Sequence, residues 1–201
     1  MDRIGAMLMA AGLSSRMGEP KPFLRWRGTS LLKYQTETLQ NAGLDPILVI
    51  AGHLTNAIKT YLPQDPSLKV VHNPHYKHGR STSIRAGLQA IDLTTIDALL
   101  ILNIDQPRQI NLILSVVKSH QESQASITIP TYQNRGGHPV IFSARLFGEL
   151  SRVSEDSQGI KALVRRHDND TNRVDLGLDE VLLDFNTKEE YCSAYKLHGS
   201  N

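Results

Sequence analysis

Short, uninterrupted apolar runs alternate along this chain with segments whose apolar residues recur at helical spacing. Four such runs fall in the first half of the sequence, at residues 4–10, 46–52, 68–72 and 97–105. Runs of this length are typical of strands buried in a mostly parallel sheet. Helical segments between strands indicate crossover connections, which is the pattern of an α/β fold.

The segments between the runs predict helices with one apolar face. The first spans Leu31 to Ala42, and Gly43 ends it. Three more are predicted from the inward positions Ile84, Leu88 and Ile91 (opening near Ser81), Ile110, Ile113, Leu114 and Val117, and Ile160, Leu163, Val164 and His167. Later strands are expected at residues 125–131, 138–143 and 180–187. We therefore expect one domain over residues 1–201, a three-layer α/β/α Rossmann-like fold with a mostly parallel mixed sheet.

Composition excludes several classes of function. The chain has 201 residues and a net charge of +2 with scattered basic residues, which argues against a nucleic-acid partner. No apolar stretch approaches the roughly 20 residues that span a membrane. The N-terminal apolar run stops at Gly12 and leads into Arg16 and Lys21, unlike a signal peptide. A single cysteine, Cys192, cannot form an internal disulfide, so we expect a cytoplasmic protein without a membrane partner.

Ligands of open α/β sheets bind at the carboxyl ends of the strands. The segments that follow the predicted strands are residues 10–22, 52–54, 73–83, 103–108 and 185–188. Most of the unusual residue patterns of the chain lie in these five segments, so we expect the functional site there.

The loop after the first strand has the composition of an anion site. Its small residues allow backbone N–H groups to approach a ligand, and they are Gly12, Ser14, Ser15 and Gly18. Arg16 and Lys21 add two cations, five residues apart, which suits a polyphosphate. The loop matches neither the Walker A spacing nor the dinucleotide fingerprint. The alternative is a solvated strand-to-helix turn whose glycines serve only backbone geometry.

Asp105 follows the fourth predicted strand, where the chain leaves the sheet. A carboxylate in this position suits Mg²⁺, which proteins usually bind through one or two carboxylates together with substrate phosphates. The alternative is a turn-forming aspartate two residues before Pro107. The phosphate-binding composition of the first loop favours the metal.

Several segments together resemble a known family. The stretch LMAAGLSSRMGEPKPFL, residues 8–24, resembles the signature of nucleotidyltransferases that activate phosphate esters with an NTP. Residues 79–88, 103–107, 135–142 and 182–187 agree with the same family in the same order. The chain thus resembles the MobA-like NTP transferases over essentially its whole length, and within them most resembles the molybdenum cofactor cytidylyltransferase branch.

The resemblance implies roles for individual residues. The nucleotide would be bound by Ala10, Ala11, Gly12, Ser14, Ser15, Arg16, Lys21, Arg80 and Ser83. Asp105 and Asn186 would hold Mg²⁺, with Asp184 as the competitor of Asn186. Arg135 and His138 would contact the acceptor, although His138 fits a structural role nearly as well. The hydroxyls of residues 81–83 would cap a helix by default.

The implied reaction is the transfer of CMP from CTP to the terminal phosphate of molybdenum-bearing molybdopterin, with release of pyrophosphate. Arg16, Lys21 and Asp105 would be the catalytic residues. The alanine pair before Gly12 favours CTP over GTP in this family. Two alternatives stay open: a sugar or polyol phosphate acceptor, and a non-catalytic nucleotide-binding chaperone of a client molybdoenzyme.

Overall fold

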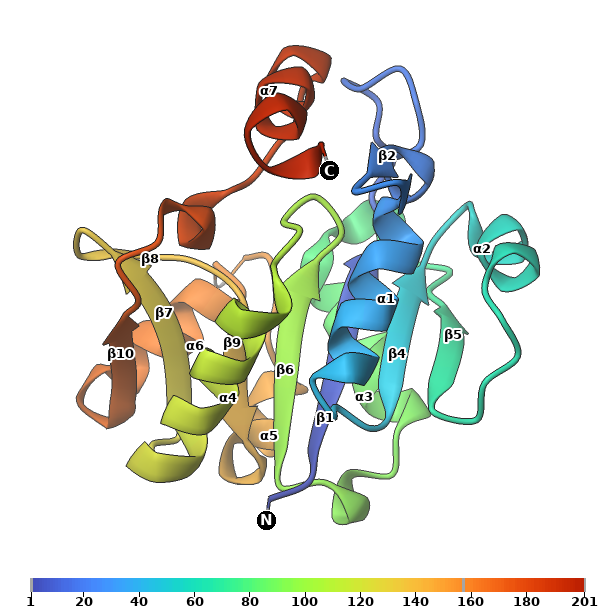
Figure 1. Cartoon of the computed structure of the whole chain (residues 1–201). Coiled ribbons are helices and arrows are strands. Elements are labelled where there is room, and N and C mark those ends of the chain that lie inside the picture. Colours follow the sequence, from blue (N-terminus) through green and yellow to red (C-terminus); the bar gives the residue numbers. More distant parts are fainter. Residues whose placement is uncertain (1, 157, 201) are drawn as a thin grey trace.

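A twisted central sheet organises the computed structural model, which describes residues 2–156 and 158–200 (Figure 1). Its strands, in spatial order, are β10 (Thr171–Asp175), β7 (Ile127–Tyr132), β9 (Val140–Ser143), β6 (Ala98–Asn103), β1 (Ile4–Ala10), β4 (Ile47–Ala51) and β5 (Leu68–His72), with β8 (Arg135–Gly136) paired to β7. Only β8 and β9 pair antiparallel to their neighbours in this sheet. The mostly parallel mixed sheet expected from the sequence is confirmed.

Helices cover both faces of the sheet. Their bounds are α1 (Leu31–Asn41), α2 (Thr55–Tyr61), α3 (Arg80–Ala90), α4 (Ile110–Ser123), α5 (Phe147–Leu150), α6 (Ile160–Arg166) and α7 (Lys188–Ala194). In Figure 1, α1 and α4 lie in front of the sheet, and α3, α5 and α6 lie behind it. Strand alternation sends Leu8 into the front core and its neighbour Met7 into the rear core. This gives the three layers that were predicted.

Short elements connect the main ones. A small antiparallel hairpin consists of β2 (Arg25–Trp26) and β3 (Thr29–Ser30). Short 3-10 helices span Lys21–Phe23, Tyr76–His78, Leu93–Thr95, Ala144–Leu146, Asp168–Asp170 and Asp179–Leu182, and a π-helical turn spans Tyr195–Gly199. Two of the 3-10 helices, Lys21–Phe23 and Tyr76–His78, lie in the strand-end loops where the site was expected.

The C-terminal arm, residues 185–199, packs against the β2–β3 hairpin (Figure 1). The Trp26 ring stacks on Phe185 at 5.8 Å between centroids and meets Tyr195 edge-on at 6.1 Å. The Tyr191 hydroxyl donates to the backbone carbonyl of Arg25 at 2.7 Å. Aromatic pairs of this kind add stability beyond their buried area, so the arm is held to the hairpin by its side chains.

The strand predicted at residues 180–187 is wrong. This segment begins in the 3-10 helix Asp179–Leu182 and then runs without a strand partner to α7. Its carbonyls at Val181 and Leu183 accept from the Arg108 side chain, so they are not available to a strand partner. The last strand is instead β10, a half-exposed edge strand without an apolar run.

The predicted inward stripe of α4 is also partly wrong. Leu114 has 43% of its surface exposed, whereas the buried positions of the helix are Leu112, Ile113, Val116 and His120. Buried His120 bonds the hydroxyl of Thr128 on β7 through its Nδ1, at 2.8 Å. His120, although polar, therefore belongs to the inward face of α4. The inward face is rotated about the helix axis relative to the face predicted from the apolar residues alone.

The capping role expected for the hydroxyls of residues 81–83 is wrong. The N-cap of α3 is Gly79, without a side-chain cap, and the N–H of Ser81 is bound by the Glu155 carboxylate at 2.7 Å.

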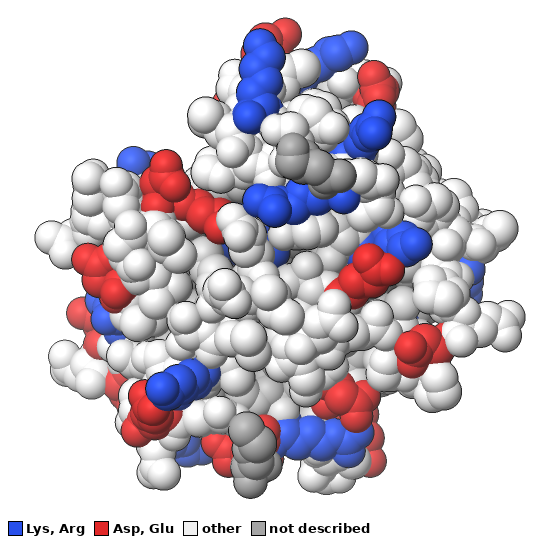
Figure 2. All heavy atoms as spheres, in the orientation of Figure 1, with Lys and Arg blue, Asp and Glu red and all other residues white. Residues whose placement is uncertain are grey.

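Charges of both signs are mixed over the face seen in Figure 2, with Lys and Arg most frequent near the top, where α7 and β2 lie. This face carries no continuous basic field of the kind that binds a nucleic acid. Among the described residues, no helix is long and apolar enough to cross a membrane.

Candidate active site

The loop that follows β1 turns sharply and returns a lysine to the end of the strand. Ser14 and Gly18 both have positive φ, at 54° and 71°. The Ser14 hydroxyl accepts from the backbone N–H of Lys21 at 3.2 Å, and its carbonyl accepts from the N–H of Met17 at 2.9 Å. Buried Met17 anchors the loop in the front core. These contacts fix the direction in which the Lys21 side chain leaves the backbone.

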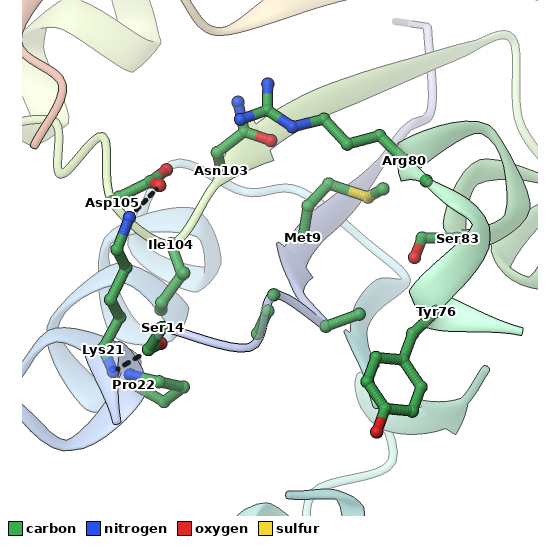
Figure 3. A pocket seen from close by; sticks show the side chains of 14 residues that line it. Met9, Ser14, Lys21, Pro22, Tyr76, Arg80, Ser83, Asn103, Ile104 and Asp105 are labelled. Carbon is green, nitrogen blue, oxygen red and sulfur yellow. Dashed lines mark hydrogen bonds and ion pairs between the residues drawn. The ribbon is translucent and has the colours of Figure 1, made fainter. Parts of the chain in front are cut away.

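Lys21 joins two residues that are far away in the sequence. Its ammonium Nζ donates to Asp105 Oδ2 at 2.6 Å and to Asn186 Oδ1 at 3.2 Å. The side chains of Lys21 and Asp105 are each only 10% exposed. The ends of β1 and β6 and the start of the C-terminal arm therefore meet at one charged point, and Figure 3 shows the pair at one side of the cavity.

A cavity opens beside this charged point. It is lined by residues 9–12 and 14 at the end of β1, by Lys21 and Pro22, by residues between 76 and 83 at the start of α3, and by residues 103–105 at the end of β6. Lys21 and Asp105 lie at one end, and Tyr76 and Ser83 lie at the other (Figure 3). Gly52 makes room for Tyr76, because a Cβ at this glycine would lie 2.6 Å from the tyrosine ring. The carboxyl ends of β1 and β6 thus form the site, as the topology predicts.

Arg108 lies under the site and binds backbone rather than a ligand. The side chain is 1% exposed, and its guanidinium donates to the carbonyls of Pro107, His138, Val181 and Leu183 at 2.8–3.0 Å. Burial lowers the pKa of Arg108 to about 10, so the group remains charged at neutral pH. One buried cation therefore ties together the three loops that carry Asp105, His138 and Asn186.

His138 is held as a neutral ring. Burial lowers the pKa of His138 to about 4, and the nearby charges of Arg108 and Arg80 act in the same direction. Its Nε2 lies 3.5 Å from the amide nitrogen of Asn103, which also donates to Gln106 Oε1. Since that amide nitrogen is a donor, Nε2 is the acceptor and Nδ1 carries the proton.

Asp184 lies close to the charged point. Its Oδ2 accepts from Gln106 at 3.1 Å, and its Oδ1 accepts from the Asn186 amide at 3.1 Å. Burial raises the pKa of Asp184, and the negative charge of Asp105 raises it further. Because the negative charges of Asp105 and Asp184 repel each other, a cation bound between them is electrostatically favoured.

The oxygens of Asp105 and Asn186 suit a hard cation. Both converge on the Lys21 ammonium, so the chain already gathers oxygen donors around one positive charge. Within the described residues, no group of three or more His, Cys, Asp or Glu side chains is arranged to hold a metal by itself. Magnesium often keeps several waters and binds through one or two carboxylates plus substrate phosphates, so this donor set fits Mg²⁺ bound together with a nucleotide.

A comparison with protein families agrees with this geometry. A family model described as MobA-like NTP transferase domain matches residues 6–171. The chain belongs to this family. The match includes every residue that lines the cavity, and the nucleotidyltransferase fold predicted from the sequence is confirmed by the solved structures below.

Relatives of this MobA-like NTP transferase cover nearly its whole length. The molybdenum cofactor cytidylyltransferase of Escherichia coli is 26% identical over 195 residues, which is 96% of each chain. The crystal structure of Rv0371c from Mycobacterium tuberculosis is 26% identical, with a TM-score of 0.81 over 98% of this chain and 99% of the other. A second structure, of Rv0371c in complex with manganese, is 24% identical, has a TM-score of 0.77 and covers 96% of this chain and 98% of the other.

The structure brings most of the predicted site residues of this transferase together. The cavity is lined by Ala10, Ala11, Gly12, Ser14, Lys21, Arg80, Ser83 and Asp105. Asn186 joins them through its bond to Lys21. The cavity lining does not include Ser15, Arg16, Arg135 or His138. Arg16 is exposed near the carboxylate of Glu190, and Arg135 is exposed on β8.

Sequence reasoning missed three residues of this candidate site. Tyr76 lines the cavity, Asn103 positions the Gln106 and His138 side chains, and Arg108 ties the loops together. Each lies inside a strand-end segment that was singled out by topology. For Arg108 the available signal was a charged residue three positions after Asp105 in a segment that follows a buried strand, since an arginine is costly to bury without partners.

Proposed function

We propose that this MobA-like NTP transferase transfers CMP from CTP to the terminal phosphate of molybdenum-bearing molybdopterin and releases pyrophosphate. The observation that carries the proposal is the Lys21–Asp105–Asn186 cluster at the mouth of the cavity. The buried ammonium of Lys21 lies at the end of a glycine-containing loop and suits a triphosphate. The carboxylate of Asp105 beside it suits the metal ion that accompanies the triphosphate. The name of the Escherichia coli relative supports the acceptor.

In this mechanism, the chain binds and orients the two phosphate groups. Lys21 and the backbone N–H groups of residues 10–14 hold the triphosphate of CTP, and Arg16 neutralises its exposed end. An oxygen of the acceptor phosphate attacks the α-phosphorus in line, a new P–O bond forms, and the bond to the β-phosphate oxygen breaks. The leaving pyrophosphate takes that electron pair. A phosphate nucleophile is ionised at neutral pH, so no general base is needed.

Asp105 and Asn186 would hold Mg²⁺, with Asp184 close enough to replace Asn186 as a ligand. When bound, the ion neutralises charge on the phosphate oxygens. Lys21, whose ammonium pairs with Asp105 in this structure, would serve as a donor to the triphosphate. Arg135 and His138 would contact the acceptor, with His138 in its neutral form.

The preference for one nucleotide base over another is assigned to the loop after β1. Ala10 and Ala11 line the cavity, and two small side chains leave space for a nucleoside next to the backbone. The alanine pair favours CTP over GTP in this family. A sugar phosphate or polyol phosphate is the second candidate acceptor, since the Lys21–Asp105–Asn186 cluster would contact the nucleotide and not the acceptor.

The test is pyrophosphate release from pure protein incubated with Mg²⁺, each of the four NTPs, and each acceptor. We expect release with CTP and molybdenum-bearing molybdopterin. Pyrophosphate release only with a sugar phosphate or polyol phosphate would show that this compound, and not molybdopterin, is the acceptor. Nucleotide binding without any pyrophosphate release would favour a nucleotide-binding chaperone of a molybdoenzyme.

Two variants identify the site that acts in this assay. Asp105→Asn should lower turnover by at least about 100-fold, because electrostatic stabilisation is lost in a buried site. Lys118→Met is the control, since Lys118 is exposed on α4 and forms its ion pair with Glu122 on the same helix. Full activity of the Asp105→Asn variant would remove this carboxylate from the mechanism.

A further inference from the structure

One glutamine side chain is buried between α1 and the carboxyl end of β6. Gln35 is 1% exposed. Its Nε2 donates to the backbone carbonyl of Ile104 at 2.8 Å and to that of Asn103 at 3.4 Å. Because a backbone carbonyl can only accept, these contacts fix which atom of the side-chain amide is the nitrogen. The other atom, Oε1, is therefore an acceptor.

The Oε1 atom of Gln35 has no donor. Among the described residues, it is the only buried side-chain oxygen or nitrogen that no hydrogen bond satisfies. A buried polar atom without a partner lowers the stability of a fold. One turn away on the same face of α1 lie three buried leucines, Leu31, Leu32 and Leu39. Stability alone would favour another apolar residue at position 35, so the glutamine points to a role other than stability.

The two carbonyls that Gln35 binds belong to the turn that carries Asp105. The carbonyl of Ile104 is part of the planar peptide that links Ile104 to Asp105, so its donor sets the direction of that peptide. Within the described part of the chain, this carbonyl accepts no other hydrogen bond. The N–H of Ile104 is bound separately, by the carbonyl of Met9 at 3.1 Å. The amide of Gln35 therefore controls the backbone that leads into Asp105.

The carboxylate of Asp105 depends on this backbone because an aspartate side chain is short. Its Oδ2 lies 2.6 Å from the Lys21 ammonium, which also donates to Asn186 Oδ1. Rotation of the preceding peptide would move the carboxylate relative to both groups. The carbonyl on the other side of Asp105 accepts from the Phe185 N–H at 3.3 Å, a longer contact than the one made by Gln35. The hydrogen bond to Ile104 is thus the tighter of the two that orient this residue.

We propose that Gln35 is a positioning residue that holds the Asp105 carboxylate in the direction needed to bind the metal ion of the nucleotide. The inference rests on the proposed function, in which Asp105 would hold Mg²⁺. The cavity is lined by Ile104 and Asp105 but not by Gln35, and Figure 3 shows the first two at its edge. Gln35 acts through the backbone of Ile104 and touches no substrate.

Gln35→Leu tests the inference, because leucine fills a similar volume and cannot donate. The thermal midpoint should stay within about 3 °C of wild type, since the unsatisfied Oε1 disappears together with the donor to Ile104. Mn²⁺ affinity in the presence of CTP, measured by paramagnetic resonance at 25 °C, should fall roughly 3- to 10-fold. Turnover should fall about 10-fold or more, because a misplaced ligand costs catalysis strongly. Wild-type Mn²⁺ affinity in this variant, or failure of the variant to fold, would overturn the inference and make Gln35 a residue of stability alone.

Gln40→Leu is the matched control on the same helix. The Gln40 amide also donates twice, to Asp65 Oδ2 at 2.9 Å and to Ser67 Oγ at 3.3 Å, but it has no contact with the turn of Asp105. This variant should keep wild-type Mn²⁺ affinity and turnover. Equal losses of Mn²⁺ affinity in the two variants would show an effect of α1 as a whole and would overturn the specific role of Gln35.

A double variant tests whether Gln35 acts through Asp105. In an Asp105→Asn background, Gln35→Leu should weaken Mn²⁺ binding no further, because the carboxylate that it positions is already gone. Additive losses would overturn the coupling. The same measurements separate this inference from the proposed function. The expected Mn²⁺ pattern without any pyrophosphate release would keep the positioning role and overturn the reaction, whereas wild-type protein that binds no Mn²⁺ with CTP would overturn both.

Discussion

Lys21 holds a buried carboxylate, Asp105, for which the described residues offer no other ion-pair partner. Its ammonium lies 2.6 Å from Asp105, and both side chains are 10% exposed. Removing one partner of a buried pair leaves the desolvation cost of the other, about 3 kcal/mol or more. The same ammonium occupies the position between Asp105 and Asn186 where a metal ion would lie.

Lys21→Met is therefore expected to have opposite effects on stability and on metal affinity. The free energy of unfolding should fall by about 3 kcal/mol, while Mn²⁺ affinity without nucleotide should rise several-fold, because the competing cation is gone. Mn²⁺ should then raise the thermal midpoint of the variant more than that of wild type. Paramagnetic resonance of free Mn²⁺ measures the affinity, and unchanged affinity in the variant would contradict the competition between ammonium and metal.

His138 predicts an acid-sensitive step in stability. Its folded pKa of about 4 lies below the ordinary value of 6.5, so the unfolded chain takes up the proton first and stability falls as pH drops from 6.5 toward 4. At pH 5 the loss is ~2 kcal/mol. His138→Gln keeps an acceptor toward Asn103 and should lose that much less stability between pH 7.5 and pH 5 in urea unfolding. Identical pH profiles of the two proteins would show that the buried ring does not titrate.

At the scale of elements, the site is assembled by loops rather than by the strands themselves. The loop after β6 carries Asp105, the loop before β9 carries His138, and the segment before α7 carries Asn186. These loops do not share a strand ladder at the site. The guanidinium of Arg108 replaces that ladder, with carbonyl acceptors in all three loops.

Arg108→Met should therefore loosen the site before it unfolds the sheet. Four carbonyls, two of them in buried hydrogen bonds, lose the guanidinium as a donor, at an expected cost of about 3 kcal/mol in unfolding free energy. Hydrogen exchange of residues 181–186 should rise ahead of exchange in β1 and β6. Arg145→Met is the control, since exposed Arg145 also donates to a backbone carbonyl, that of Gln124, at 2.6 Å. A uniform rise in exchange over the whole chain would contradict a local clamp.

For the molecule as a whole, apolar runs were sufficient to predict the three layers and the edge of the sheet where the site lies. Apolar runs did not predict the elements that polar residues form. β10 has no apolar run because it is a half-exposed edge strand, and the apolar run at residues 180–187 serves loop packing instead. The pairing of Lys21 with Asp105 spans 84 residues of sequence, so no local pattern encodes it. Motif resemblance found those two residues, but it could not find Arg108 or Gln35, whose roles lie in hydrogen bonds to distant backbone.

The C-terminal arm holds Asn186 in place, so we expect its removal to lower turnover. Glu190 Oε2 accepts from the backbone N–H groups of Asn186 and Thr187, at 2.6 and 3.1 Å. Deleting residues 188–201 should leave the far-ultraviolet circular dichroism of the sheet nearly unchanged and lower turnover about 10-fold or more, because a misplaced ligand costs catalysis strongly. Glu190→Gln, which keeps one acceptor, should lose less. Full turnover of the truncated chain would make the arm dispensable for the site.

The packing of Trp26 gives this protein its own optical probe. Trp26 is the single tryptophan of the chain, it is 2% exposed, and its ring rests on Phe185 and Tyr195 of the C-terminal arm. Departure of the arm would let water reach the indole, and its emission would shift to longer wavelength. Steady-state fluorescence can thus follow docking of the arm during nucleotide titration without any label.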